Sequence, residues 1–293
     1  MRRTFIEELV TLAELNSNLV LIVGDLGFSV VEPFACRFPE RFINAGVAEQ
    51  NMMGLAAGMA SEGCHVFVYS IANFPTFRCA EQIRNDVDYH NLPVTIVSVG
   101  GGLAYGNLGY SHHAIQDYGL IRMMPNMLIA APGDPMEVRA CMRYLVANPQ
   151  PSYLRLGKAG EPNFHEVIPS VQPGQWQSIK PNGLKKRTIL TTGATLSIAM
   201  EWIKKEEYSE FALHSLPLWG MKSKNIQSYA ISEWDQVITI EDHLHDCGFG
   251  SWLRESIEDE KQLMLRLTVK ALDSRVFGLV GKQETLNRAG GLL

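Results

Sequence analysis

The sequence predicts an α/β protein built from two open, mostly parallel sheets. Short apolar runs alternate with stretches of helical length in the first half of the chain, and several of these runs are apolar throughout. Strands that are buried on both faces of a parallel sheet have this composition. The same alternation resumes in the last third of the chain, and 293 residues are enough for two domains of ordinary size.

Residues 1–160 are predicted to form the first domain, in which six strands alternate with helices. The expected strands are LVLIVGD, RFINAG, HVFVYS, PVTIVSVG, MLIAAP and SYLRLG, and helical patterns cover 47–61, 77–88 and 113–124. The most distinct helix start is at Asp134, an N-cap residue followed by Pro135 and, three residues after the cap, by Glu137. Because helices separate the strands, we expect the strands to run parallel.

A linker is predicted at residues 161–185. The stretch 160–183 carries four prolines and three glycines and has no sustained periodicity. Beyond it, strand and helix patterns resume in RTILTTGA, EFALHSLPL and DQVITIED. Residues 186–293 are therefore predicted to form a second, smaller α/β domain.

The composition argues against several classes of protein. A formal net charge of -5 disfavours a nucleic-acid-binding surface, which needs a basic stripe. No apolar run is long enough to span a bilayer, and the amphipathic N-terminal stretch is unlike a signal peptide. The five cysteines are an odd number without CxxC spacing, which is typical of reduced thiols. We expect a cytoplasmic protein without a nucleic-acid or membrane partner.

Glu49 is the residue whose position is hardest to explain by packing alone. It opens a predicted helix among Val47, Met52, Met53 and Leu55, where a charge is costly. One interpretation is a partner for the helix dipole, because a helix N-terminus favours an anion. The other is a functional carboxyl group, which in apolar surroundings requires a hydrogen-bond partner.

Five other residues each have a structural and a functional interpretation. Phe74 and Phe77 in NFPTF are typical of a core, and Arg155 is either a surface charge or an anion clamp at the end of a strand. His112 and His113 either form a solvated or capping pair or place one imidazole in a cleft at the carboxyl end of a strand. The residue types alone leave these alternatives open.

Two glycine motifs and one histidine motif favour structural roles. GDLG and VGGGLAYG lack the strand-to-helix setting of a dinucleotide site, so the glycines at 100–102 are expected to allow a tight backbone turn beside a ligand or another chain. HLHD, at 243–246, has no third metal ligand at a convincing spacing. No metal site is predicted in the chain.

Taken together, the motifs resemble the transketolase family over nearly the whole chain. RFINAGVAEQNMMGLAAGMA, EQIRND, LGYSHHAIQDYGLIRMMPNMLIAAPGDPMEV and PSYLRLG are similar to its pyrimidine-binding domain, in that order. TILTTGATLSIAMEW, VITIEDHLHDCGFGSWL and GLVGKQETLNRAGGL resemble its C-terminal domain. The resemblance implies a thiamine diphosphate-dependent transferase that moves a two-carbon ketol unit from a ketose donor to an aldehyde acceptor.

The resemblance also implies a role for each candidate residue near the cofactor. Glu49 matches the catalytic glutamate that hydrogen-bonds N1′ of the aminopyrimidine, and a carboxyl group in a dry pocket can hold or share a proton there. Phe74 and Phe77 match the aromatic wall against the pyrimidine, although Ala80 replaces a third aromatic residue. Asp25 matches an acidic residue beside the cofactor, near the boundary between two subunits.

Four further residues match positions that face the substrate. His112 matches the catalytic histidine that faces the oxygen atoms of the substrate, where it can stabilise developing negative charge. Its neighbour His113 stands where glutamine is common in the family. Ser29 and Arg155 match positions that bind a sugar phosphate at the mouth of the site.

The diphosphate-binding half of a transketolase is missing from this chain. In the family that half carries a GDG…N motif that holds Mg²⁺ and the phosphates, whereas the chain has only GDL at 24–26. The resemblance therefore implies the C-terminal (β) subunit of a split transketolase, whose N-terminal partner holds most of the metal and the phosphates. We expect an α2β2 heterotetramer with the active site between subunits, and no activity without the partner.

The substrate channel departs from the family pattern at two positions. Leu108 replaces an aspartate and Gly100 replaces a histidine. Loss of the aspartate removes an acceptor for a sugar hydroxyl group, which predicts a donor or acceptor other than the ordinary pentose phosphates, such as a deoxy, modified or nucleotide-linked sugar. Two alternatives are a decarboxylating carboligase, similar to deoxyxylulose phosphate synthase or a 2-oxo acid dehydrogenase β subunit, and a non-catalytic partner subunit.

Overall fold

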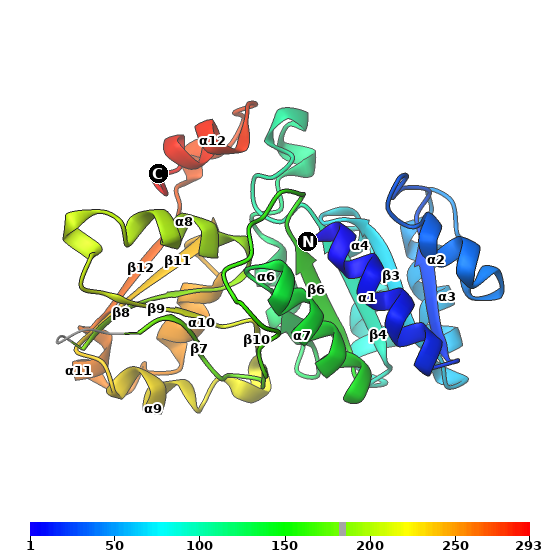
Figure 1. The fold of residues 1–293 in the computed structure, drawn as a ribbon, viewed down its shortest axis with the longest axis horizontal. Helices are drawn as coiled ribbons and strands as arrows, with labels where there is room; N and C mark the ends of the chain where they lie inside the picture. The colour runs from blue at the N-terminus through cyan, green and yellow to red at the C-terminus, as the bar shows by residue number, and fades with distance from the viewer. Residues whose placement is uncertain (182–185) are drawn as a thin grey trace.

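The computed structural model describes residues 1–181 and 186–293 and has the α/β architecture expected from the sequence. Figure 1 shows two sheets lying side by side, with the N-terminal region on the right and the C-terminal region on the left. Both sheets are mostly parallel, as predicted. None of the helices within the described ranges is long and apolar enough to cross a membrane.

The first sheet has seven strands in the order β10-β5-β6-β4-β3-β1-β2. The strands are β1 (Leu19–Val23), β2 (Phe42–Asn44), β3 (His65–Ile71), β4 (Val94–Val99), β5 (Leu128–Ala130), β6 (Ser152–Leu156) and β10 (Leu218–Gly220). Every neighbouring pair is parallel except β10 with β5. All residues of β1, β4, β5 and β6 are buried, and for β1 and β5, which are apolar throughout, this confirms the interpretation of continuous apolar runs as central strands.

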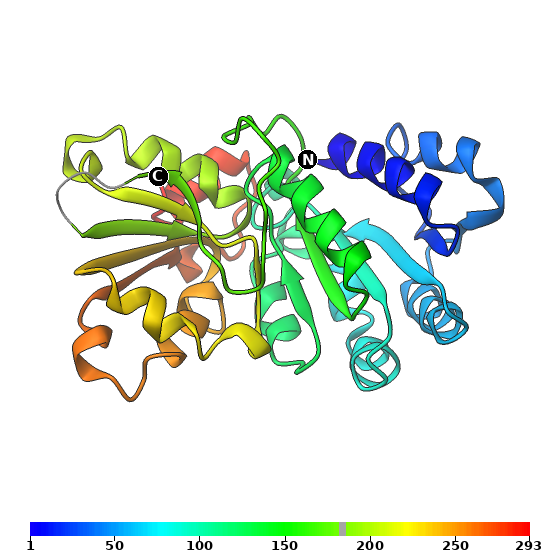
Figure 2. The same ribbon diagram turned by 60° about the horizontal axis from the view of Figure 1, so that its bottom comes forward.

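Helices cover both faces of this sheet (Figure 2). Helices α1 (Arg2–Leu15), α2 (Glu32–Arg37) and α7 (Pro135–Ala147) pack into one core cluster, and α3 (Glu49–Ser61), the π-helix Ile83–Asp88 and α6 (Asp117–Arg122) pack into the other. The predicted helix 77–88 is divided between α4 (Phe74–Phe77), α5 (Ala80–Gln82) and the π-helix. The predicted helix 113–124 begins only at Asp117, because Ala114 forms a bridge with Gly102.

Asp134 caps α7 as predicted. Its Oδ1 accepts the backbone N–H of Glu137 at 2.7 Å. Its Oδ2 accepts the backbone N–H groups of Phe164 and His165 at 2.8 and 2.9 Å, so the cap also holds the chain that follows β6.

The carboxyl group of Glu137, fully buried beside this cap, makes the stability of the protein depend on pH. Its Oε2 accepts from the Gly133 N–H at 2.6 Å and from the Ser215 hydroxyl at 3.0 Å, while Oε1 lies 3.8 Å from Nε2 of His165. Burial raises the pKa of Glu137 to about 7, and in the unfolded chain this carboxyl group should titrate near its ordinary pKa of 4.5.

We expect the free energy of unfolding to fall as the pH rises from about 4.5 through about 7, by up to about 3 kcal/mol. The contribution is fully present below the unfolded pKa because the neutral carboxyl is the form that burial favours. Urea unfolding at pH 5 and pH 8 measures the difference in the free energy of unfolding. In Glu137→Gln, the part of this difference that comes from Glu137 should disappear. The exposed Glu284→Gln is the control. The prediction would be contradicted if the free energy of unfolding of the Glu137 variant changed with pH as steeply as that of the wild type.

The second sheet has five strands in the order β12-β11-β8-β9-β7. The strands are β7 (Gln177–Lys180), β8 (Arg187–Thr191), β9 (Ala212–Ser215), β11 (Gln236–Leu244) and β12 (Leu267–Leu272). All neighbours are parallel except β7 with β9. The helices of this region are α8 (Leu196–Trp202), α9 (Gln227–Ser232), α10 (Phe249–Glu255), α11 (Lys261–Met264) and α12 (Gln283–Ala289).

Two short strands depart from the predicted division into domains at 160 and 186. Strand β7 lies inside the predicted linker 161–185, whose last four residues, 182–185, are outside the described residues. Strand β10 comes from the C-terminal region but extends the first sheet. It is held there by Trp219, which is fully buried with its ring 5.1–5.3 Å from those of Tyr118, Phe249 and Trp252. Strands of three or four residues are too short to show a period in the sequence.

Candidate active site

All the predicted site residues except Arg155 follow the carboxyl ends of four parallel strands. Strand β1 is followed by Asp25 and Ser29, β2 by Glu49, β3 by Phe74 and Phe77, and β4 by His112 and His113. Open parallel sheets bind ligands at this edge. The topology therefore brings together side chains that are almost ninety residues apart in the sequence.

Glu49 is the first residue of α3 and is only 5% exposed. The fully buried Met52 and Met53 follow it, whereas Val47 is exposed. Its Oε1 accepts a hydrogen bond from Nη1 of Arg78 at 2.9 Å. The expectation that a carboxyl group in these surroundings needs a partner is thus confirmed, but the sequence did not identify the partner.

Arg78 connects Glu49 to the candidate aromatic wall. Its guanidinium carbon lies 4.3 Å from the centroid of the Phe74 ring. The Phe74 ring in turn meets the His112 ring edge-on, with centroids 5.2 Å apart. Phe77 is 47% exposed beside them. A cavity of about 380 Å³ adjoins this group, lined by Asn73, Phe74, Phe77, Arg78, Tyr110, Ser111, His113 and Gln116.

The two histidines have different environments. His112 is partly exposed, and its Nδ1 lies 3.0 Å from the Ser111 hydroxyl. Burial, followed by the charges of His113 and Arg78, lowers the pKa of His112, which favours the neutral ring at pH 7. His113 is buried, with Nε2 3.3 Å from the carbonyl oxygen of Gly106, while its Nδ1 has no partner among the described residues. His113 is nevertheless one of the residues that line the cavity of about 380 Å³.

The loop after β1 is held in an uncommon backbone conformation. Asp25 and Ser29 have φ angles of 54° and 64°, in the left-handed region that few residues other than glycine adopt. Asn44, at the end of β2, accepts the backbone N–H groups of Asp25 and Gly46 and donates to the Asp25 carboxylate at 3.0 Å. Asn44 thus fixes the loop that carries Asp25 and Ser29, a positioning role that the sequence did not indicate.

The structure does not place Arg155 at the mouth of the site, which corrects the expected sugar-phosphate contact. Its side chain is buried, and its Nε and Nη1 donate to Asp117 and Asp242 at 2.7 and 2.6 Å. Nη2 donates to the carbonyl oxygen of Ala114 at 2.7 Å. Because Asp242 belongs to β11, Arg155 joins the two sheets. An arginine within a completely buried strand needs buried acceptors, and here carboxylates of the same chain provide them.

Two glycines of the predicted tight turn pack closely against side chains of the same chain. Gly100 and Gly102 have φ angles of 84° and 63°, as the expected turn requires. A Cβ atom on Gly100 would lie 2.1 Å from the Tyr105 ring, and one on Gly102 would lie 2.1 Å from Asp242. Tyr105 thus fills the space beside Gly100, and Nζ of Lys158 lies 5.0 Å from its ring centroid. Lys158 is an exposed cation directly after β6, a position at this edge that the sequence analysis did not single out.

His243, the first histidine of HLHD, has a structural role, as expected. His243 is buried, its ring stacks on that of Tyr118 with centroids 5.5 Å apart, and its Nε2 accepts the Gly119 N–H. Within residues 1–181 and 186–293, no group of three or more His, Cys, Asp or Glu side chains is arranged to hold a metal ion.

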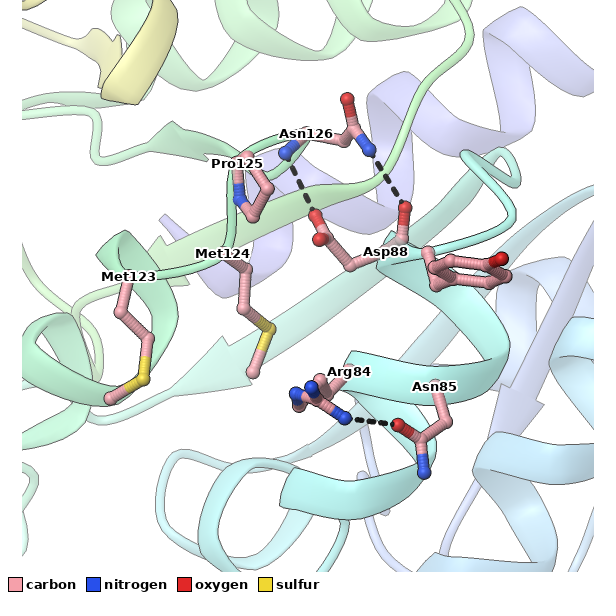
Figure 3. A pocket seen from close by; sticks show the side chains of 8 residues that line it. Arg84, Asn85, Asp88, Met123, Met124, Pro125 and Asn126 are labelled. Carbon is pink, nitrogen blue, oxygen red and sulfur yellow. Dashed lines mark hydrogen bonds between the residues drawn. The ribbon is translucent and has the colours of Figure 1, made fainter.

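A larger cavity, of about 580 Å³, lies away from all the predicted residues (Figure 3). It is lined by Arg84, Asn85, Asp88, Tyr89, Met123, Met124, Pro125 and Asn126. The Asp88 carboxylate accepts the Asn126 backbone N–H at 2.9 Å, and the Asp88 carbonyl oxygen accepts from the Asn126 amide. These hydrogen bonds tie the π-helix to the segment before β5.

Comparison with known proteins identifies the family. Residues 1–160 match the pyrimidine-binding domain of transketolase. The chain is 31% identical to a subunit of apulose-4-phosphate transketolase from Phocaeicola vulgatus, over 88% of this chain and 83% of that protein. It is 33% identical to a putative transketolase C-terminal section of Methanocaldococcus jannaschii, over 100% and 92% of the two chains. The chain belongs to the transketolase family.

Solved structures agree with this assignment and relate the chain to split members of the family. A split gene transketolase, solved as an inactive beta4 tetramer, is 30% identical with a TM-score of 0.83, and the match covers 99% of this chain and 93% of that one. Transketolase from Leishmania mexicana has the same fold, with a TM-score of 0.79 at 18% identity, but only 43% of that chain is matched. The protein thus corresponds to the C-terminal portion of a transketolase, which is a separate subunit in split members.

Proposed function

We propose that this chain is the β subunit of a thiamine diphosphate-dependent transketolase and that Glu49 contacts the aminopyrimidine of the cofactor. One observation carries the proposal: a buried carboxyl group at a helix N-terminus is joined through Arg78 to Phe74, which itself contacts His112. A carboxyl group beside an aromatic ring suits the pyrimidine half of the cofactor. Thiamine diphosphate would supply the carbanion chemistry that breaks and forms the bond next to a carbonyl group.

The side chains of this subunit would then have distinct tasks. Glu49, whose side chain is buried, would hold or share a proton at N1′ of the pyrimidine. Phe74 and Phe77 provide the ring surface against which the pyrimidine lies. His112, neutral at pH 7, can donate a hydrogen bond to a substrate oxygen on which negative charge develops. Asp25 would lie beside the cofactor, near the boundary with the partner.

The remaining contacts would come from a partner. We assign the diphosphate and Mg²⁺ mainly to an N-terminal, diphosphate-binding subunit, in an α2β2 assembly in the cytoplasm. Two observations support this proposal. One relative is named as a single subunit of a transketolase and another as a C-terminal section, and the split gene transketolase with four beta chains is described as inactive. Alone, this chain would hold the cofactor weakly.

The substrate is proposed to be a sugar phosphate other than the ordinary pentose pair. Leu108, which replaces a family aspartate, is 51% exposed at this edge, and Tyr105 fills the space of the side chain that Gly100 lacks. Ser29 and His113 would contact the sugar from the loops after β1 and β4. Because the Phocaeicola vulgatus relative is named for apulose 4-phosphate, that ketose is the first donor to test.

The test combines this chain with the diphosphate-binding transketolase subunit of the same organism. We expect ketol transfer only from the mixture, in the presence of thiamine diphosphate and Mg²⁺. With xylulose 5-phosphate and ribose 5-phosphate, kcat/KM should be at least about tenfold lower than with the preferred pair, because a sugar hydroxyl group loses its acceptor at Leu108. Turnover by this chain alone would contradict the need for a partner subunit. Equal kcat/KM for both substrate pairs would contradict the proposed substrate.

A decarboxylating carboligase is the second candidate. The chain is 29% identical to 1-deoxy-D-xylulose-5-phosphate synthase of Clostridium perfringens over 99% of its length, although this covers only 46% of that enzyme. Such an enzyme would release CO₂ when pyruvate is offered with an aldehyde acceptor. CO₂ release in place of ketol transfer by the assembled pair would favour this candidate.

A further inference from the structure

Arg78 contacts the two groups that the proposed function assigns to the pyrimidine. Its Nη1 donates to Oε1 of Glu49 at 2.9 Å, and its guanidinium carbon lies 4.3 Å from the centroid of the Phe74 ring. A pyrimidine that hydrogen-bonds this carboxyl group and lies against this ring needs the same surfaces. If Glu49 and Phe74 bind the aminopyrimidine as proposed, the guanidinium and the aminopyrimidine would therefore compete for one place.

The exposure of the two side chains shows which partner can leave. The Glu49 side chain is 6% exposed, whereas the Arg78 side chain is 51% exposed. Glu49 is also fixed in place as the first residue of α3. A buried carboxylate without a partner is costly, so Glu49 must be paired at all times. An arginine that is half in water loses little when its ion pair is broken.

We propose that Arg78 is an exchangeable counter-ion, which pairs with Glu49 in the free chain and gives way to the aminopyrimidine when the cofactor binds. The inference rests on the proposed function, because it assigns Glu49 and Phe74 to the pyrimidine. The planar guanidinium suits the task, since it can donate to a carboxylate and lie over an aromatic ring at once, much as a pyrimidine does. Arg78 thus keeps the site folded before assembly and lowers the apparent affinity for the cofactor.

The test compares Arg78→Met with Arg84→Met. Arg84 is a matched control because its guanidinium donates to the neighbouring Asn85 in the pocket of Figure 3, whereas that of Arg78 donates to Glu49. In the assembled enzyme at fixed Mg²⁺, we expect Arg78→Met to bind thiamine diphosphate about three- to tenfold more tightly, and Arg84→Met to bind it as the wild type does. Intrinsic fluorescence measures the dissociation constant without any need for turnover.

A second measurement uses this chain alone. In urea unfolding, Arg78→Met should lower the midpoint in the wild-type background and leave it nearly unchanged in the Glu49→Gln background, because the ion pair is already lost there. Arg78→Lys, which keeps the charge but not the planar group, serves both measurements if the methionine variant folds poorly, and its effects should be smaller. Weaker cofactor binding by the Arg78 variants, or equal midpoint shifts in both backgrounds, would overturn the proposal. Full activity of Glu49→Gln would instead overturn the proposed function and leave the midpoint result standing.

Discussion

In the assembled enzyme, Glu49→Gln is expected to lower kcat by about 10²–10⁴-fold, the range typical of a lost acid–base group. Glutamine has nearly the same shape as glutamate, so it can still fill the pocket at the start of α3. It cannot take up and return a proton at the pyrimidine. The loss should appear as a fall in kcat with all substrate pairs, because the carboxyl group acts on the cofactor rather than on the sugar.

The matched control is Glu62→Gln at the opposite end of α3. Glu62 is the C-cap residue of the same helix and is exposed, so its substitution should leave kcat within about twofold of the wild type. Circular dichroism and the size of the complex establish that both variants fold and assemble. If Glu49→Gln retained more than about a tenth of the wild-type kcat, a proton-sharing role for this residue would be excluded.

Glu49 could be selected as a candidate from the sequence because a charge in an apolar stretch of helix has few structural explanations. Its partner could not, because the position of Arg78 depends on how the short helix α4 leaves β3. Sequence spacing predicts which residues share a helix face, but it does not predict where a loop directs a long arginine side chain. The ion pair between α3 and the end of α4 is a tertiary contact between residues 29 positions apart.

The error at Arg155 has a different origin. Arg155 does lie near the carboxyl end of a strand, which is where ligands bind, so this part of the interpretation is correct. Side chains on a buried strand point alternately to its two faces, so a position near the end of a strand does not by itself mean exposure. Arg155 lies within β6, all of whose residues are buried, whereas Lys158 comes after the end of this strand and is exposed.

The cores of both sheets could be anticipated for a physical reason that does not extend to their edges. Strands buried on both faces are mostly apolar, and β1 and β5 are apolar throughout, which leaves a clear pattern in the sequence. The edge strands β7 and β10 have only four and three residues, which is too short to show such a pattern, although β10 is itself buried. The contact between β10 and β5, which links the C-terminal region to the first sheet, was therefore not visible in the sequence.

A buried ion-pair network at the same junction leads to the second large expected effect. Arg155→Met should lower the free energy of unfolding by about 3–5 kcal/mol, because it leaves Asp117 and Asp242 as buried carboxylates without their cation. The Tyr118 ring, 4.4 Å from the guanidinium carbon, would lose its cation as well. Urea or thermal unfolding of this chain measures the change.

The cost arises from the unpaired charges rather than from the lost attraction, and this can be tested separately. Adding Asp117→Asn and Asp242→Asn to Arg155→Met should recover a large part of the stability, because neutral amides replace the orphaned carboxylates. The control is Arg288→Met, whose exposed ion pair with Glu284 should contribute less than about 1 kcal/mol. If Arg155→Met cost no more than Arg288→Met, the two sheets would not depend on this network, and the packing around Trp219 would have to hold them together.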